Sequence, residues 1–243
     1  MAQRTRLAPP ALVCVFTLGL LVPACGGKEK PPEAPKAAAC PDDTVELPRG
    51  GKRFCMERTE VTVNAYLECV GKAQCSAASE GRECNRDTLQ AQSHPVNCID
   101  ATQAEGFCAY RGRRLPTEQE WEWAAGGAGK GTPEPVAGAC WSGGMPQHAT
   151  CATDRRGAQD NGLGIHDLAG NVAEWTSSGD AAHRVVRGGA YSSNVPADLK
   201  PDARRTVAET TRHPGLGFRC VLSLGGSSGP LRAARDTRYG RGA

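Results

Sequence analysis

Cysteine is the residue type in this chain with the greatest chemical potential, and the sequence holds twelve of them. Two, Cys14 and Cys25, belong to the N-terminal stretch. The other ten form an even set: Cys40, Cys55, Cys69, Cys75, Cys84, Cys98, Cys108, Cys140, Cys151 and Cys220. A zinc site would need clustered pairs such as C-x2-C, and none is present. An even set at this density is typical of a disulfide framework in an exported chain, so the sequence predicts five disulfides.

The N-terminal stretch has the parts of an export signal that ends at a cysteine. Arg4 and Arg6 form a positive region, and Ala11–Val22 form an apolar run of about a dozen residues, too short for a membrane-spanning helix. Small residues precede Cys25, in the manner of a bacterial lipobox, where the cysteine thiol receives diacylglycerol and the leader is cleaved. We therefore predict lipidation of Cys25. The alternative is an ordinary secretory leader that is cut after Ala24.

The predicted leader, residues 1–24, is followed by a lipidated tether over residues 25–39. The tether consists of Gly, Lys, Pro, Glu and Ala, a composition that cannot bury a core. Acyl chains on one cysteine anchor a chain without a spanning helix. No aspartate follows Cys25, so we expect a cell-envelope protein on the outer membrane, facing the periplasm or the cell surface. One domain over residues 40–224 and a disordered tail over residues 225–243 complete the predicted organisation.

Charge and composition restrict the class of protein. The net charge is +3, and the leader carries two arginines and no acid, so the mature chain is close to neutral. The basic residues are dispersed, which argues against a nucleic-acid partner. Thirty glycines, seventeen prolines and few aromatic residues predict a loop-rich domain with little regular structure.

Three helices have recognisable starts, and several short strands surround them. Thr62 is a suitable N-cap for a helix that ends near residue 71, and a second helix is expected after Asp100. Thr117 and Glu120 have the spacing of a capping box for a third helix. Strands are predicted at Val45–Leu47, Arg53–Glu57, Arg184–Arg187 and Phe218–Leu222.

Four motifs occur in a fixed order along the chain: RLPTEQEWEW at residues 114–123, GNVAEWTS at 170–177, VRGGAY at 186–191 and GLGFRC at 215–220. Together they resemble the formylglycine-generating enzyme (sulfatase-modifying factor) superfamily over about residues 40–224. The resemblance implies an α+β, C-type-lectin-like formylglycine-generating-enzyme fold that is loop-rich, low in regular secondary structure and stapled by disulfides.

The resemblance also implies where catalysis would take place. The family's enzymes oxidise a peptide cysteine to formylglycine with oxygen and a copper ion, which two cysteine thiolates hold. Ser193 stands where the first thiolate is expected, and Asp198 lies near the second. There is no cysteine between Cys151 and Cys220, and a serine hydroxyl is neither soft nor deprotonated at neutral pH. Copper-dependent formylglycine formation is therefore not expected.

The family's core disulfide maps onto Cys108 and Cys220. The other eight cysteines are expected to pair with near neighbours in the sequence, although spacing alone does not determine connectivity. These local pairs would be Cys40–Cys55, Cys69–Cys75, Cys84–Cys98 and Cys140–Cys151.

Calcium is the one cofactor that the resemblance leaves in place. The resemblance implies that calcium is bound by the carboxylates of Asp167 and Glu174 and by the carbonyls of Gly170 and Val172. Hard oxygen ligands of this kind suit calcium. The alternative is that these polar groups only cap a turn.

Other conspicuous residues are expected to have structural roles in the fold. Arg187 and Arg219 are predicted to form buried ion pairs with acids such as Glu120 or Glu174. Three tryptophans are interpreted as core anchors rather than ligand platforms: Trp121, Trp123 and Trp175.

Together these features favour a membrane-anchored lipoprotein that is not an enzyme. Its family groove would bind a peptide, a glycan or another envelope partner. The alternative is a metal-dependent oxidoreductase of the same superfamily with a non-standard active site. Retention of the scaffold without the cysteine pair at Ser193 and Asp198 favours the first hypothesis.

Overall fold

The computed structural model describes residues 39–129, 139–141, 149–153 and 162–224. The predicted leader, Cys25, the tether up to residue 38 and the tail 225–243 lie outside the described residues. The chain divides into two units, Met1–Lys36 and Ala37–Ala243, and every described residue belongs to the second. Among the described residues, no helix combines the length and apolar character that a membrane crossing requires.

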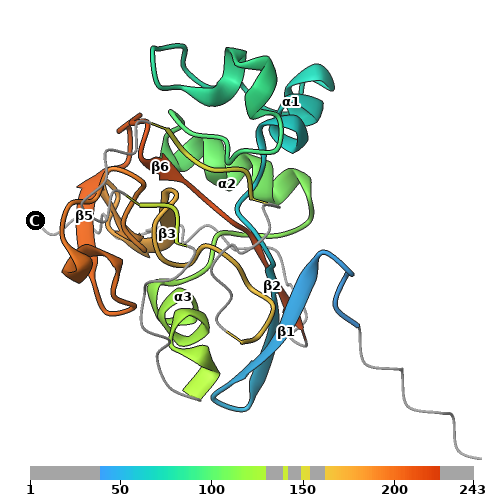
Figure 1. The fold of residues 1–243 in the computed structure, drawn as a ribbon. Coiled ribbons are helices and arrows are strands. Elements are labelled where there is room, and N and C mark those ends of the chain that lie inside the picture. Colours follow the sequence, from blue (N-terminus) through green and yellow to red (C-terminus); the bar gives the residue numbers. More distant parts are fainter. Residues whose placement is uncertain (1–38, 130–138, 142–148, 154–161, 225–243) are drawn as a thin grey trace, which may run out of the picture. The chain divides into compact units, whose positions relative to one another are not determined.

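The described domain mixes short helices and short strands (Figure 1). The α-helices are α1 (Val63–Gly71), α2 (Ala101–Tyr110) and α3 (Glu118–Ala125). Four 3-10 turns are η1 (Asn85–Asp87), η2 (Leu89–Ala91), η3 (Gly127–Gly129) and η4 (Pro196–Leu199). The strands are β1 (Thr44–Arg49), β2 (Lys52–Glu57), β3 (Ala173–Gly179), β4 (His183–Arg187), β5 (Arg204–Ala208), β6 (Leu216–Gly217) and β7 (Val221–Leu224).

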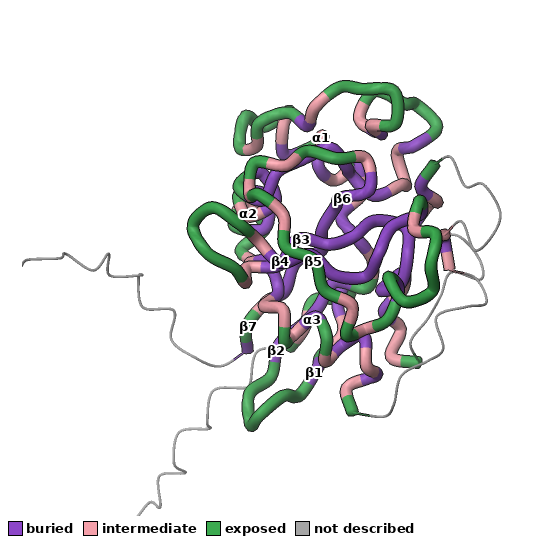
Figure 2. The backbone as a smooth tube through the Cα atoms, turned by 90° about the vertical axis from the view of Figure 1, so that its left-hand side faces the viewer, coloured by how far each residue is buried: buried purple, intermediate pink, exposed green. Residues whose placement is uncertain are grey.

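The strands form two sheets. One has the order β1-β2-β7, so the last strand of the domain pairs with its first hairpin, with Cys55 opposite Leu222. The other has the order β5-β4-β3-β6, in which β3 and β6 run parallel. Figures 1 and 2 both place α1 at the end of the domain away from the turn between β1 and β2.

The three helices begin where their caps predict. The Thr62 side chain accepts a hydrogen bond from the Ala65 backbone at the start of α1. In α3, the Glu120 amide donates to Thr117 Oγ1 (3.1 Å), and the Thr117 amide donates to Glu120 Oε2 (2.9 Å). Asp100 caps α2 in the same reciprocal way. Each bond satisfies an amide that the first helical turn leaves unpaired, which explains why the starts are readable from sequence.

The strands at the C-terminal end differ from the sequence-based expectation. A single strand was expected over Phe218–Leu222, but the structure has β6 and β7 separated by residues 218–220. The interruption contains Arg219, whose side chain is completely buried. Strands β3 and β5 were not predicted, because β3 is largely buried and β5 is mostly exposed, so neither has a clear alternation of apolar and polar residues.

The core consists of two clusters at the centre of the domain, where the buried segments of Figure 2 gather. One joins α1 and α2 to β3 and β6 around Tyr66, Phe107 and Phe218, whose rings pack within 5.6–6.5 Å of one another. Trp175 belongs to this cluster, and Trp121 to the one beside β2. These two tryptophans are fully buried, as expected, but Trp123 is only partly buried and donates to the Pro48 carbonyl.

Five disulfides staple the domain, and all ten described cysteines take part. Cys108–Cys220 joins α2 to the residue before β7 across 112 positions. The other four pairs are local, and they are the neighbouring pairs expected: Cys40–Cys55, Cys69–Cys75, Cys84–Cys98 and Cys140–Cys151.

Candidate functional site

The candidate site is built on the glycine turn that follows β4. Gly188 and Gly189 have φ values of +93° and +65°, which only glycine adopts readily. A β-carbon on Gly188 would lie 2.9 Å from the Trp121 ring, and one on Gly189 would lie 2.8 Å from the Asp198 carbonyl. The two glycines therefore let η4, which carries Asp198, pack directly against the turn.

This close approach makes the turn sensitive to a single methyl group. Gly188→Ala is expected to lower the free energy of unfolding by about 2–4 kcal/mol, because left-handed strain and overpacking add. Urea denaturation measures the loss. Gly112→Ala is the matched control, since Gly112 also has a positive φ (+67°) but open space around its α-carbon. Equal losses in the two variants would contradict the packing argument.

Ser193 and Asp198 occupy different surroundings. Ser193 closes a turn: its Oγ accepts from the Ala190 amide (3.0 Å), and its own amide donates to the Ala190 carbonyl (2.9 Å). Asp198 is exposed in η4. A hydroxyl used to close a turn is a structural group. Copper has no soft ligand here, because every cysteine that the structure describes is in a disulfide.

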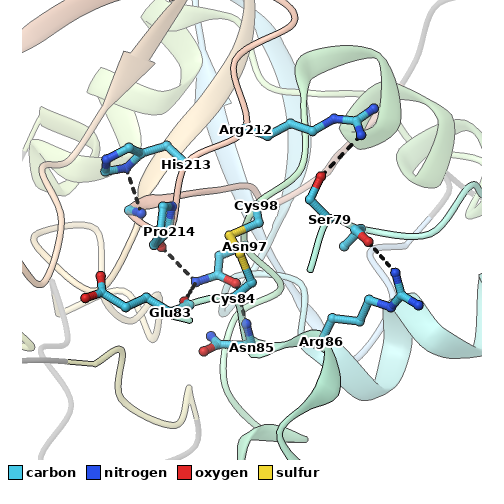
Figure 3. The surroundings of a disulfide bond; sticks show 12 residues. Ser79, Glu83, Cys84, Asn85, Arg86, Asn97, Cys98, Arg212, His213 and Pro214 are labelled. Carbon is cyan, nitrogen blue, oxygen red and sulfur yellow. Dashed lines mark hydrogen bonds between the residues drawn. A yellow bond between two sulfur atoms is a disulfide. The ribbon is translucent and has the colours of Figure 1, made fainter. Parts of the chain in front are cut away.

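The loop beside this turn is held by the buried side chain of Asn97. Figure 3 shows the Asn97 amide between Glu83 and Pro214, next to the Cys84–Cys98 disulfide. Asn97 Nδ2 donates to the Glu83 carbonyl (2.9 Å) and to the Pro214 carbonyl (2.8 Å). Asn97 therefore joins the loop that carries Glu83 to the chain before β6, which is a structural function.

Tyr191, directly after the glycine turn, connects to the same loop. Its hydroxyl donates to the Glu83 carboxylate (2.8 Å). Burial, together with this carboxylate, raises the pKa of Tyr191 well above its ordinary value of 10.0. The phenol is therefore a proton donor that holds the loop, and it is not a phenolate at neutral pH.

A cavity of about 230 Å³ opens between the glycine turn and the start of β5. We call it the arginine cavity, because three of its lining residues are arginines: Arg187, Arg204 and Arg205. Gly188, Gly189, Asp198 and three apolar residues complete its lining. This cavity was not predicted from the sequence, because its walls come from four separate elements, β3, β4, η4 and β5. The adjacent Arg204 and Arg205 were the only signal in the sequence.

Arg219 and Glu174 form a fully buried ion pair at the centre of the domain. The guanidinium Nε and Nη2 donate to both carboxylate oxygens over 2.7–3.0 Å, and Trp121 Nε1 donates to Glu174 at 2.8 Å. The pairing predicted for Arg219 is therefore present. Arg187 instead pairs with Glu118 (2.5 Å) and Glu122 (3.1 Å), which lie on the side of α3 that faces β4.

The ion pair bears directly on the predicted calcium site. Glu174 already receives two hydrogen bonds on each carboxylate oxygen, which fills its acceptor positions. Asp167 is buried and adopts a left-handed backbone conformation at the start of the same loop. In the described residues, no group of three His, Cys, Asp or Glu side chains is arranged to hold a metal ion. A calcium ion on Glu174 would require Arg219 to release one oxygen.

Glu60 is a second buried carboxylate near this pair. It is 1% exposed, and neither of its oxygens has a hydrogen-bond partner among the described residues. Arg219 Nη2 lies 4.0 Å away. Burial, and next the negative charge of Asp167, raise the pKa of Glu60 well above its ordinary value of 4.5.

This shift predicts a pH-dependent stability. The folded state keeps the Glu60 proton to a higher pH than the unfolded chain, so the free energy of unfolding falls as the pH rises from about 4.5 through the folded-state pKa. Glu60→Gln cannot lose this proton. The variant is expected to be more stable than the wild type at neutral pH, and the difference should vanish below about pH 4. Urea denaturation over a pH series measures it, and parallel curves for the two proteins would contradict the assignment.

Comparison with known proteins agrees with this geometry. Residues 24–224 match the sulfatase-modifying factor enzyme 1-like domain. An inactive C-alpha-formylglycine-generating enzyme 2 of Bos taurus is 33% identical, over 56% of this chain and 53% of that protein. A formylglycine-generating enzyme of Streptomyces coelicolor is 30% identical, over 59% of this chain and 57% of that protein. The chain thus spans about half the length of the curated relatives that it matches.

A solved structure supports the fold. Treponema denticola variable protein 1 superposes with a TM-score of 0.54 and 20% identity, over 70% of this chain and 84% of that one. The domain has the loop-rich α+β arrangement of C-type-lectin-like proteins, and the family match extends over both of its sheets. This chain belongs to the family of sulfatase-modifying factor enzyme 1-like domains, whose members include the formylglycine-generating enzymes.

Proposed function

We propose that this chain is a membrane-anchored lipoprotein that uses its formylglycine-generating-enzyme-like domain to bind a peptide, glycan or envelope partner, without catalysis. The observation that carries the proposal is the state of the cysteines. All ten in the described domain are disulfide-bonded, and Ser193 and Asp198 stand at or near the positions expected for copper ligands. Similarity to a relative named as an inactive enzyme supports the same conclusion.

A peptide-oxidation assay tests the absence of catalysis. The mature chain would be purified from the periplasm and incubated with copper, a reductant, oxygen and a Cys-x-Pro-x-Arg peptide, and mass spectrometry would follow the peptide. We expect no change in its mass, while an active formylglycine-generating enzyme converts the same peptide in parallel. A Ser193→Cys, Asp198→Cys variant shows whether the two thiols alone restore activity. A wild-type product lighter by the cysteine-to-aldehyde difference would overturn the proposal.

Detergent partition tests the membrane anchor. The chain expressed with its own leader should enter the detergent phase, because acyl chains on Cys25 bury many methylene groups. Cys25→Ala should move to the aqueous phase. Equal partition of the two proteins would favour an ordinary leader cut after Ala24.

Calcium at residues 167–174 stays a prediction. Adding calcium to metal-free protein should raise the melting temperature, since a ligand that binds only the folded state stabilises it. Asp167→Asn should remove this effect. No shift would mean that the Arg219–Glu174 pair alone holds the loop.

A further inference from the structure

Strand β5 is the outer strand of the sheet β5-β4-β3-β6, and four of its five residues are exposed (Figure 1). Its pairing with β4 shows which main-chain groups the domain uses. The Glu209 amide donates to the Ala182 carbonyl (2.9 Å), directly beyond the paired residues of the two strands. In an antiparallel pair every second residue bonds to the partner strand, so Arg205 and Val207 bond to β4.

The same register turns the main chain of Arg204, Thr206 and Ala208 away from β4. Val185, which lies opposite Thr206, confirms it, because the Val185 carbonyl accepts from Thr176 of β3 (2.8 Å) rather than from β5. No described residue bonds to the three outward amides or to the carbonyls of Arg204 and Thr206. The outer edge of β5 therefore offers donors and acceptors at the spacing of a strand.

The domain closes the edge of its other sheet, at β1. The Arg58 amide donates to the Asp43 carbonyl (3.0 Å), so the main chain of Glu46 and Pro48 faces outward. Proline has no amide hydrogen, and the Pro48 carbonyl already accepts from Trp123 Nε1 (2.7 Å). Strand β5 contains no proline. An open edge of this kind is a template for another strand.

The charge of β5 favours one kind of partner. Its charged residues are Arg204 and Arg205. Arg204 is paired with Glu118 at 2.7 Å, and no carboxylate of the described chain forms an ion pair with Arg205. Opposite charges on neighbouring strands stabilise a sheet, and like charges destabilise it. An acidic segment is therefore favoured over a second copy of β5, which would bring four arginines together.

We propose that β5 binds an extended, acidic segment of a partner polypeptide, which adds a fifth strand to the sheet. The segment would pair its main chain with Arg204, Thr206 and Ala208, and place its acidic side chains beside Arg205. Main-chain bonds give affinity in this mode of recognition, and side chains give specificity. The inference rests on the proposed binding function and names the surface that binds and the chemistry of the partner.

Hydrogen exchange of the mature chain, followed by nuclear magnetic resonance, tests the edge with three blocked peptides. Acetyl-Glu-Val-Thr-Val-Glu amide is the acidic probe. The same peptide with every amide N-methylated keeps the charge but cannot donate a main-chain hydrogen bond. Acetyl-Lys-Val-Thr-Val-Lys amide reverses the charge. Ionic strength is held constant, since salt screens such contacts.

We expect the acidic peptide to slow exchange at the amides of Arg204, Thr206 and Ala208 in a saturable way. The amides of Arg205 and Val207 already bond to β4 and should not change, and this alternation is the signature of an added strand. The acidic peptide should bind about five-fold more tightly than the lysine peptide. The N-methylated peptide should give no protection.

Two substitutions at Thr206 separate the main chain from the side chain. Thr206→Pro removes the outward amide without removing a bond to β4, and an edge strand tolerates proline at such a position. Thr206→Ala is the matched control, because it removes the same side chain and keeps the amide. The proline variant should bind the acidic peptide about five-fold more weakly, and the alanine variant should bind it like the wild type. Melting temperatures report whether both variants are folded.

Four results would overturn the inference. They are an absence of alternating protection, equal binding of the N-methylated peptide, equal binding of the lysine peptide, and a dimer of the free chain that protects the same amides. The last would assign the edge to a second copy. All four use the wild-type chain, so they decide the matter even if Thr206→Pro does not fold. None depends on peptide oxidation, so failure at β5 is distinguishable from failure of the non-catalytic proposal.

Discussion

Replacing Cys108 and Cys220 together by alanine is expected to lower the free energy of unfolding by about 5 kcal/mol. The bridge closes a sequence separation of 112 residues, the longest of the five described disulfides. Loss of the bridge raises the conformational entropy of the unfolded chain. Alanine adds no polar group at the two positions, which are fully buried. Guanidinium denaturation under oxidising conditions measures the change.

The control is the double alanine variant of Cys69 and Cys75. This bridge spans only 6 residues, so the same argument predicts a loss of about 2 kcal/mol. If removing Cys108–Cys220 lowered the free energy of unfolding no more than removing the short bridge, loop length would not determine how much a disulfide stabilises this domain.

Glu174→Ala is expected to destabilise the domain by about 3–5 kcal/mol, because it leaves the Arg219 charge buried without its partner. Arg219 is completely buried and donates hydrogen bonds to both carboxylate oxygens of Glu174. It also donates to the backbone carbonyls of residues 57, 58 and 166, so it ties β2 and the loop before β3 to the end of β6. Thermal and urea denaturation report the loss.

The matched control for this prediction is Glu46→Ala. Glu46 pairs with Arg53 at the same distance of 2.7 Å, but both side chains are about 40% exposed. An exposed pair contributes less than about 1 kcal/mol. If the two variants lost equal stability, burial of the Arg219–Glu174 pair would not be what makes it important.

Local features of the sequence predicted local structure well. Thr62, Asp100 and Thr117 start the three helices, because a cap and the amides that it satisfies lie within one turn of each other. The β1–β2 hairpin contains the strands that were predicted at Val45–Leu47 and Arg53–Glu57. The neighbouring cysteine pairs were expected from proximity, whereas Cys108–Cys220 was expected only through the family resemblance.

Features that depend on distant parts of the chain were not predictable from the sequence. Arg187 lies far from α3 in the sequence, and only the fold shows that it meets Glu118 and Glu122 there. The interruption between β6 and β7 is equally non-local. It places Arg219 next to Glu174, and a local strand pattern contains no information about that partner.

The sequence by itself determined the family, the starts of the helices and the lack of cysteine at the expected copper positions, because each depends on residue types and short spacings. Only the tertiary structure decided that Glu174 uses its carboxylate oxygens to pair with Arg219, that Ser193 closes a turn and that three arginines line a cavity. Those properties arise where β3, β4, η4 and β5 meet. Burial and pairing at such a meeting point depend on all of these segments at once, and no single stretch of sequence contains them.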